Sequence, residues 1–226
     1  MRIWGTLMNK EIQIEYYNTY LQEYMSENKV WNTDKIRSDL KIFGMKLKSA
    51  IKVALEDLKE TYDDERPYML SLAYAYEYED SYFWTIVSTE KEYEKNLEKY
   101  SEKESHSQLM YYKYCPEESC HWDVGKSAFD ILNEDYISMV EEQEYDDEDS
   151  FWSTDEFDDF YEELEEICLR SIEEVKAEGI LEKLQLNNIL FQYYVREYYS
   201  EEKEIEMFER LNNNDKTAIK EFTEWL

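Results

Sequence analysis

Residues 68–87, YMLSLAYAYEYEDSYFWTIV, decide the fold that we expect for this chain. From Tyr68 to Tyr78, large and small side chains alternate strictly, which is typical of a β-strand with two unlike faces. The polar residues 79–81 then form a short turn, and the aromatic and β-branched run at 82–87 predicts the returning strand. The stretch therefore predicts an antiparallel hairpin at the centre of the protein.

A long helix is predicted immediately before the hairpin, over residues 34–61, because its apolar side chains recur every three or four positions. We expect this helix to cover the small-residue face of the first strand, which carries Met69, Ser71, Ala73 and Ala75. Another face of the helix carries Lys41, Lys48, Lys52 and Lys59. These lysines are either solvated or paired with carboxylates elsewhere in the chain, and the sequence leaves both possibilities open.

Capping residues and apolar periodicity predict the elements that flank these two. Helices are expected at 9–26, 89–101, 127–144, 153–177 (stopped by Gly179), 200–211 and 215–225, strands at 109–114 and 189–195, and a loop at 115–122. This order predicts an α+β fold, in which helices cover an antiparallel sheet of about four strands. We expect residues 1–32 to be an N-terminal helical extension and residues 33–226 to be a single α+β domain.

The charge of the chain is large and unevenly distributed. The 226 residues include 25 basic and 55 acidic side chains, a formal charge of −30, yet 42% are hydrophobic and 16% aromatic, so a folded core is expected. Residues 1–62 hold ten basic and nine acidic side chains, whereas residues 63–226 hold 15 basic and 46 acidic ones. Such a balance repels nucleic acid and anionic lipid, and it favours a cationic protein partner.

The acidic excess is densest at residues 141–166, which contain 15 carboxylates and no basic residue. As a continuous helix this run would carry one charge per about 2.6 Å, against one per about 1.7 Å in duplex DNA. Interleaved aromatic side chains could anchor a partner, although a solvated face is the simpler interpretation. The candidate partner-binding residues are Glu141, Glu142, Glu144, Asp146, Asp147, Glu148, Asp149, Trp152, Asp155, Asp158, Asp159 and Glu162.

The sequence offers little support for catalysis, a cofactor or a membrane location. It has no glycine-rich phosphate loop, no nucleophile elbow, only two histidines, and no apolar run of membrane-spanning length. The first residues lack the apolar segment of a secretion signal, and three cysteines without one suggest reduced thiols in the cytoplasm. We therefore expect no cofactor, no membrane contact, no direct binding of nucleic acid and no enzymatic activity.

Cys115, Cys120 and His121 are the one sequence-local group of metal-ligand residue types. Their C-x₄-C-H spacing lacks a fourth ligand and the usual C-x₂-C turn, which favours two partly buried thiols and a structural histidine over a metal site. Cys168 lies on the apolar side of its predicted helix and is expected in the core.

From about residue 45 onward, the chain resembles a bacterial family known as domain of unknown function 4303. The resemblance follows the aromatic strand and its return at Ser81–Thr89, then Tyr114-Cys115-Pro116, Trp122-Asp123 before a helix, and Asn188-Ile189-Leu190-Phe191 before an acidic segment. It covers about three quarters of the chain and contains no catalytic signature. Because members of such families look like neighbours of polymorphic-toxin loci, the resemblance implies an immunity role.

Together these observations favour a cytoplasmic immunity protein that neutralises a bacterial toxin, such as a nuclease, by occluding its basic surface. A phage-type mimic of nucleic acid that inhibits a host DNA-binding or defence enzyme would use the same physics. A hydrolase that depends on paired carboxylates is the alternative from another class. With 55 acidic residues, however, paired carboxylates arise at any spacing and have no specificity.

Overall fold

A computed structural model describes residues 33–75, 82–102, 104–141, 155–196 and 198–226. Its helices are α2 (Thr33–Tyr62), α3 (Glu90–Tyr100), α4 (His106–Tyr114), α5 (Lys126–Glu141), α7 (Asp155–Ala177), α8 (Ile180–Leu184), α9 (Glu201–Leu211) and α10 (Lys216–Trp225), with two short 3₁₀ turns, η1 (Asp63–Glu65) and η2 (Pro116–Glu118). Its strands are β1 (Pro67–Ala75), β2 (Tyr82–Thr89), β3 (His121–Trp122) and β4 (Leu190–Val195). The expected helix at 9–26 lies outside the described residues.

The four strands form one sheet in the order β3-β2-β1-β4, which confirms the α+β class. β1 pairs with β2 and β2 with β3 in antiparallel fashion, but β4 runs parallel to β1. The prediction of a purely antiparallel sheet was therefore wrong. β4 runs opposite to β2, but the helices between these strands carry the chain past β1, and β4 therefore pairs with the far side of β1 in parallel.

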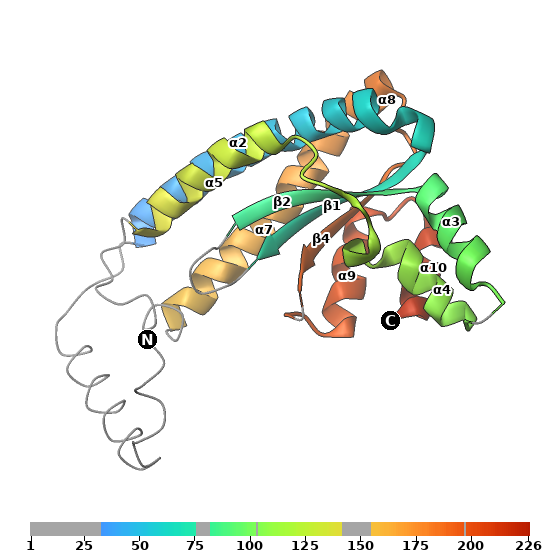
Figure 1. The fold of residues 1–226 in the computed structure, drawn as a ribbon. Coiled ribbons are helices and arrows are strands. Elements are labelled where there is room, and N and C mark those ends of the chain that lie inside the picture. Colours follow the sequence, from blue (N-terminus) through green and yellow to red (C-terminus); the bar gives the residue numbers. More distant parts are fainter. Residues whose placement is uncertain (1–32, 76–81, 103, 142–154, 197) are drawn as a thin grey trace, which may run out of the picture.

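The three longest helices cover one face of the sheet. In Figure 1, α2, α5 and α7 lie along the same side of the strands, and α2 contacts both of the others. The ring of Phe43 on α2 packs 5.3 Å from that of Phe83 on β2, which lies opposite Tyr74 of β1. Thus α2 packs on the large-residue face of β1 (Leu70, Leu72 and Tyr74) and not on the small-residue face, which corrects the prediction.

A second apolar cluster covers one end of the opposite face. There Met69 of β1 packs with Tyr114 of α4, Phe208 of α9 and Phe222 of α10. Tyr68 joins this cluster although strict alternation predicts it on the other face, because the register of β1 shifts between Pro67 and Met69. The other end of this face is the subject of the next subsection.

Two asparagines cover strand backbone that no neighbouring strand pairs, one on β2 beyond the reach of β3 and one on the edge strand β4. Asn133 of α5 accepts from the Phe83 amide at 2.7 Å and donates to the Phe83 carbonyl at 2.9 Å, beside β2. Asn212, just after α9, does the same for Phe191 on β4, at 2.9 and 2.7 Å. Each carboxamide thus replaces a neighbouring strand, which limits edge-to-edge association.

Residues 109–114 are helical, which contradicts the predicted strand. Ser105 and Gln108 form a reciprocal capping box that starts α4, and Met110 and Tyr114, four residues apart, are the buried positions of the helix. The third strand is instead β3, inside the stretch predicted to be a loop. A short apolar run does not distinguish a strand from a buried helix, and a two-residue strand leaves no periodic signal.

The helix ends follow their predicted signals wherever the structure describes them. The Thr89, Ser200 and Asp215 side chains accept from backbone amides at the starts of α3, α9 and α10, and Gly179 takes a left-handed conformation two residues after α7. Ser153 lies outside the described residues.

The basic face of α2 is partly paired within the protein. Lys48 contacts Glu174 at 2.6 Å and Glu178 at 3.0 Å on and just after α7, and Lys52 also contacts Glu178. Lys59 likewise contacts Asp63 at 2.6 Å. Pairing with the chain's own carboxylates therefore holds for three of the four lysines.

Candidate functional site

The uncovered end of the second sheet face carries a groove about 370 Å³ in volume. Ala73 of β1 lies in register between Trp84 of β2 and Tyr194 of β4. A methyl group between two large rings leaves a hollow, since neighbouring side chains on one face project the same way from the sheet. We call this the aromatic groove; its lining is Tyr74, Ala75, Tyr82, Trp84, Ile86, Glu117, Trp122, Tyr194, Arg196 and Tyr198.

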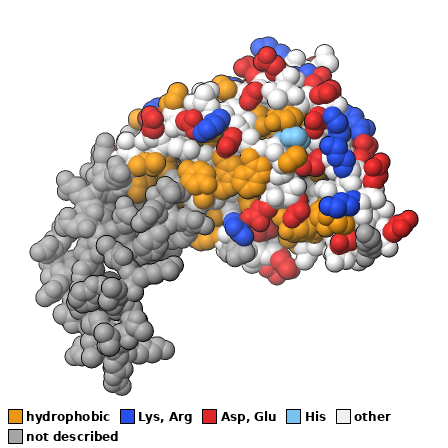
Figure 2. Space-filling model, viewed as in Figure 1, with side chains coloured by type: hydrophobic (Ala, Val, Ile, Leu, Met, Phe, Trp, Pro, Cys, Tyr) orange, Lys and Arg blue, Asp and Glu red, His pale blue; other side chains and the backbone are white. Residues whose placement is uncertain are grey.

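Two tryptophans form one wall of the aromatic groove. Trp122 of β3 stacks on Trp84 with ring centroids 6.2 Å apart and planes 17° from parallel, and Tyr82 lies 4.9 Å from Trp84. Trp122 keeps 46% of its surface exposed, and its indole nitrogen donates to the Ser119 carbonyl at 2.6 Å. The buried indole nitrogen of Trp84 has no hydrogen-bond partner among the described residues. Figure 2 shows hydrophobic side chains gathered over β1 and β2 on this face.

The other wall of the groove is polar. Arg196, just after β4, contacts Glu117 of η2 with 3.1 Å between Nε and Oε1. Burial and the neighbouring Glu117 raise the pKa of the Tyr194 phenol, so this hydroxyl stays protonated. The groove therefore combines stackable rings with an ion pair that can exchange hydrogen bonds with a bound group.

The described part of the acidic run borders the groove. Asp159 and Glu162 are exposed on α7, and the ring of Tyr161 between them lies 4.7 Å from that of Tyr198, which lines the groove. Among the predicted site residues, 142–149 and Trp152 lie outside the described residues. Glu141, Asp155 and Asp158 are placed on α5 and α7 by their backbone alone.

Further along α7, carboxylates of the acidic run are paired within the molecule. Glu165 contacts Lys203 at 2.8 Å, and Glu166 accepts two hydrogen bonds from Arg210, at 2.6 and 3.0 Å. Glu163 lies 3.6 Å from Arg37. The run is thus not one uniform anionic surface: these carboxylates join helices, and Asp159 and Glu162 face outward.

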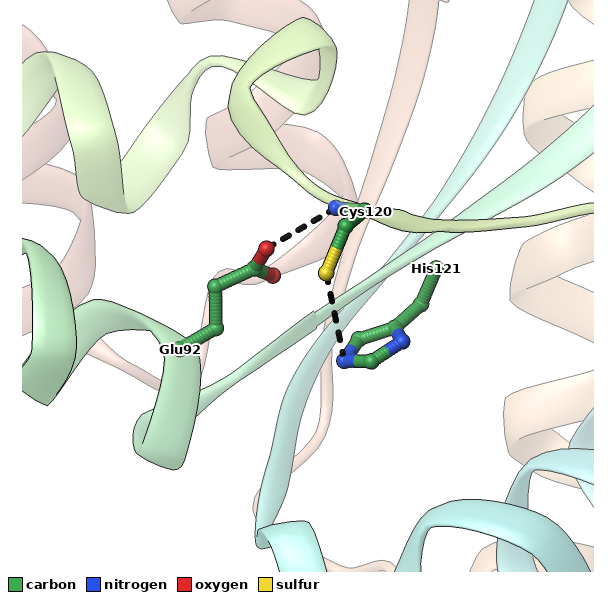
Figure 3. Close-up of side chains that lie close together, drawn as sticks. All are labelled: Glu92, Cys120 and His121. Carbon is green, nitrogen blue, oxygen red and sulfur yellow. Dashed lines mark hydrogen bonds between the residues drawn. The ribbon is translucent and has the colours of Figure 1, made fainter.

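A second group of reactive side chains lies beside β3. Glu92 of α3, Cys120 and His121 come together, with one donor atom from each within 4.8 Å of the others (Figure 3). Glu92 accepts from the Cys120 amide at 2.9 Å, and the Cys120 sulfur lies 3.9 Å from His121 Nε2. Glu65 of η1 approaches the same nitrogen at 3.0 Å. We call Glu92, Cys120 and His121 the Glu-Cys-His cluster.

The three cysteines differ in their surroundings. Cys168 is fully buried in the core, as predicted, and Cys115 is buried apart from the Glu-Cys-His cluster. Cys120 is exposed, not partly buried as expected. Partial desolvation of its sulfur and the hydrogen bond to Glu92 raise the pKa of the Cys120 thiol to about 11. This thiol is therefore protonated at neutral pH.

Sequence reasoning missed the aromatic groove because it requires the register of three strands. The alternation of Tyr82, Trp84 and Ile86 within β2 was the available signal, since it marks one aromatic face.

The fold and groove define a class: an α+β protein with a mixed four-stranded sheet, helices that cover one face of the sheet, and an aromatic groove at one end of the other face. Within that class, the chain belongs to the family described as Domain of unknown function (DUF4303), whose model matches residues 47–213. The matched segment contains the whole aromatic groove and the Glu-Cys-His cluster. Neither a curated protein nor a solved structure matches the chain. None of the described helices has the length and apolar character to span a bilayer.

Proposed function

We propose that this protein acts by stoichiometric binding of a protein with a basic surface, and that it is a cytoplasmic immunity protein that neutralises a bacterial toxin. The observation that carries the proposal is the position of the aromatic groove beside exposed carboxylates. Tyr198 lines the groove and contacts Tyr161, which lies between Asp159 and Glu162 on α7. The anchoring rings and the exposed carboxylates of α7 are therefore linked through one pair of tyrosines.

The charge and the rings have separate roles in this proposal. The net charge of −30 draws in a cationic partner from a distance and raises the association rate, an effect that salt weakens. The stacked pair Trp84 and Trp122 supplies the anchor, because large rings that become desolvated in an interface carry much of the binding free energy. Their loss is expected to act mainly on the dissociation rate.

The state of the exposed thiol also supports binding over catalysis. A thiol must be deprotonated to act as a nucleophile, and cysteine nucleophiles have a lowered pKa. The pKa of Cys120 is shifted in the opposite direction, up to about 11. Its neighbour Glu92 is a carboxylate and raises the pKa of the thiol, whereas a cationic neighbour or a helix N-terminus lowers the pKa of a nucleophilic cysteine.

The test is co-expression of the full chain with the product of the gene encoded beside it. The proposal expects rescue of growth from that product and a 1:1 complex by size-exclusion chromatography with light scattering. Absence of both rescue and complex, or catalytic turnover by the chain alone, would contradict it.

Three variants test whether this surface binds the partner. Asp159→Asn with Glu162→Gln should slow association a few-fold and flatten its salt dependence. Trp122→Ala should speed dissociation at least about tenfold, the loss of one anchor. Glu182→Gln, on the exposed surface of α8 beyond the far end of α7, is the matched control and should leave both rates unchanged. If Glu182→Gln slows association as much per charge removed as the double variant does, and Trp122→Ala changes neither rate, then net charge alone, and not this surface, governs binding.

A further inference from the structure

The Glu-Cys-His cluster joins metal-ligand side chains from separate parts of the chain. Glu92 lies in the first turn of α3, and Cys120 and His121 lie at β3, 28 residues later. Glu65 of η1 contacts His121 from a third element. We propose that these four side chains bind a divalent transition-metal ion of the Zn²⁺ type.

The distances in the cluster are close to those of a tetrahedral site. With Zn–S near 2.3 Å and Zn–N near 2.05 Å, a tetrahedral ion holds sulfur and nitrogen about 3.6 Å apart. Cys120 Sγ and His121 Nε2 are 3.9 Å apart. An oxygen and a nitrogen ligand are held about 3.3 Å apart, and Glu65 Oε2 lies 3.0 Å from the same His121 nitrogen. The Glu92 carboxylate lies within 4.8 Å of the other two donor atoms, so its side chain would move closer to complete the geometry.

The donor set selects the type of metal. One sulfur, one imidazole nitrogen and carboxylate oxygens suit Zn²⁺ or Co²⁺, whereas Mg²⁺ and Ca²⁺ require oxygen ligands throughout. Binding replaces the proton of the Cys120 thiol: the S–H bond breaks, a metal–sulfur bond forms, and H⁺ leaves to solvent. The two carboxylates and the resulting thiolate offset the charge of the ion, and Lys91 lies 3.4 Å from Glu65 at the edge of the cluster.

The exposure of the cluster fits an ion that enters from solvent. Cys120 is exposed, while the His121 and Glu65 side chains retain 14% and 22% of their surface. Glu92 also holds the loop in place, because its carboxylate accepts from the Cys120 amide at 2.9 Å. One ligand thus positions another before any ion binds, as the supporting hydrogen bonds of metal sites do.

The experiment is titration of the untagged, reduced full chain with Zn²⁺ alone, followed by calorimetry, and with Co²⁺, followed by near-ultraviolet absorption. The proposal expects one Zn²⁺ per chain, release of a proton, and a thiolate-to-cobalt charge-transfer band. Cys120→Ser should abolish the band, and Cys120→Ser, His121→Gln and Glu92→Gln should each weaken Zn²⁺ binding at least tenfold. Mg²⁺ in excess should not compete.

Two controls come from the chain itself. His106→Gln changes the only other histidine, which is exposed on α4, and Glu94→Gln changes a carboxylate of α3 that pairs with Arg66; both should retain wild-type affinity within about twofold. The unmodified protein gives a second measurement: Zn²⁺ should slow the reaction of Cys120, the exposed one of the three cysteines, with a disulfide reagent. Unchanged binding in Cys120→Ser, or no slowing of the thiol reaction, would overturn the proposal.

Discussion

Replacement of Asn212 by alanine should destabilise the protein far more than replacement of any surface asparagine. The Asn212 side chain is 1% exposed and makes three hydrogen bonds to the backbone. It accepts from the Phe191 amide at 2.9 Å, and it donates to the carbonyls of Phe191 at 2.7 Å and Phe208 at 2.9 Å. The variant leaves the amide and carbonyl of Phe191 without partners in the interior.

The magnitude follows from those two groups. A buried polar group left unpaired costs about 1–3 kcal/mol, so the two Phe191 groups give about 2–6 kcal/mol. Removal of the buried carboxamide offsets part of this, and we expect a loss of about 3 kcal/mol in unfolding free energy. For a chain of this length that corresponds to a fall of about 6–12 °C in Tm.

The assay is equilibrium unfolding in urea, with Asn213→Ala as the control at the neighbouring, exposed position. The control should change the unfolding free energy by less than about 0.5 kcal/mol. Asn212→Asp should cost at least as much as Asn212→Ala, because a carboxylate cannot donate to either carbonyl. If Asn212→Ala unfolds within about 0.5 kcal/mol of the wild type with an unchanged m-value, edge capping by this side chain does not stabilise the sheet.

Two further predictions concern stability. Gly125→Ala should lower the unfolding free energy by more than about 1 kcal/mol, because φ is +72° and the added Cβ would lie 2.8 Å from the Ala54 backbone. Gly179→Ala, at φ +74° with nothing within 4 Å of the added Cβ, should cost only the strain of the left-handed backbone. Equal losses of Tm in the two variants would refute a steric contact between Cβ and Ala54. The hydrogen bonds from Arg210 lower the pKa of Glu166. This pair therefore stabilises the folded state fully at pH values above the ordinary glutamate pKa, and the stabilisation is lost as the pH falls through the lowered pKa. Glu166→Gln should therefore make unfolding free energy less dependent on pH between about 5 and 3, and an unchanged pH profile would contradict this.

Elements with a local signal were predictable from sequence. The hairpin β1-β2 follows from alternation, and the starts of α3, α9 and α10 follow from Thr89, Ser200 and Asp215, because a cap acts within four residues of itself. The α4 segment was not predictable as a helix from its apolar run alone, although Ser105 and Gln108 mark its start. The direction of β4 depends on how the intervening helices pack, and no local pattern encodes that packing.

The candidate sites depend on contacts between distant parts of the chain. The small Ala73 leaves a hollow only because Trp84 and Tyr194 flank it, and Tyr194 is 121 residues away in sequence. The metal-ligand types at Cys120 and His121 were visible, but the sequence grouped them with Cys115, and that spacing favoured structural roles. The structure supplies Glu92 instead, because α3 follows directly from the strand that pairs with β3.

β3 connects the two proposed sites although it contains two residues. It pairs with β2 through Ile86 opposite Trp122 and Val87 opposite His121. Because successive strand residues point to opposite faces, Trp122 projects into the aromatic groove and His121 toward Glu65. So short a strand has few hydrogen bonds of its own to hold it, and the Ser119 hydroxyl, which donates to the Val87 carbonyl, adds one more. An ion bound by Cys120 and His121 would fix the same segment from the other face, so the position of Trp122, and with it the wall of the groove, would depend on the metal.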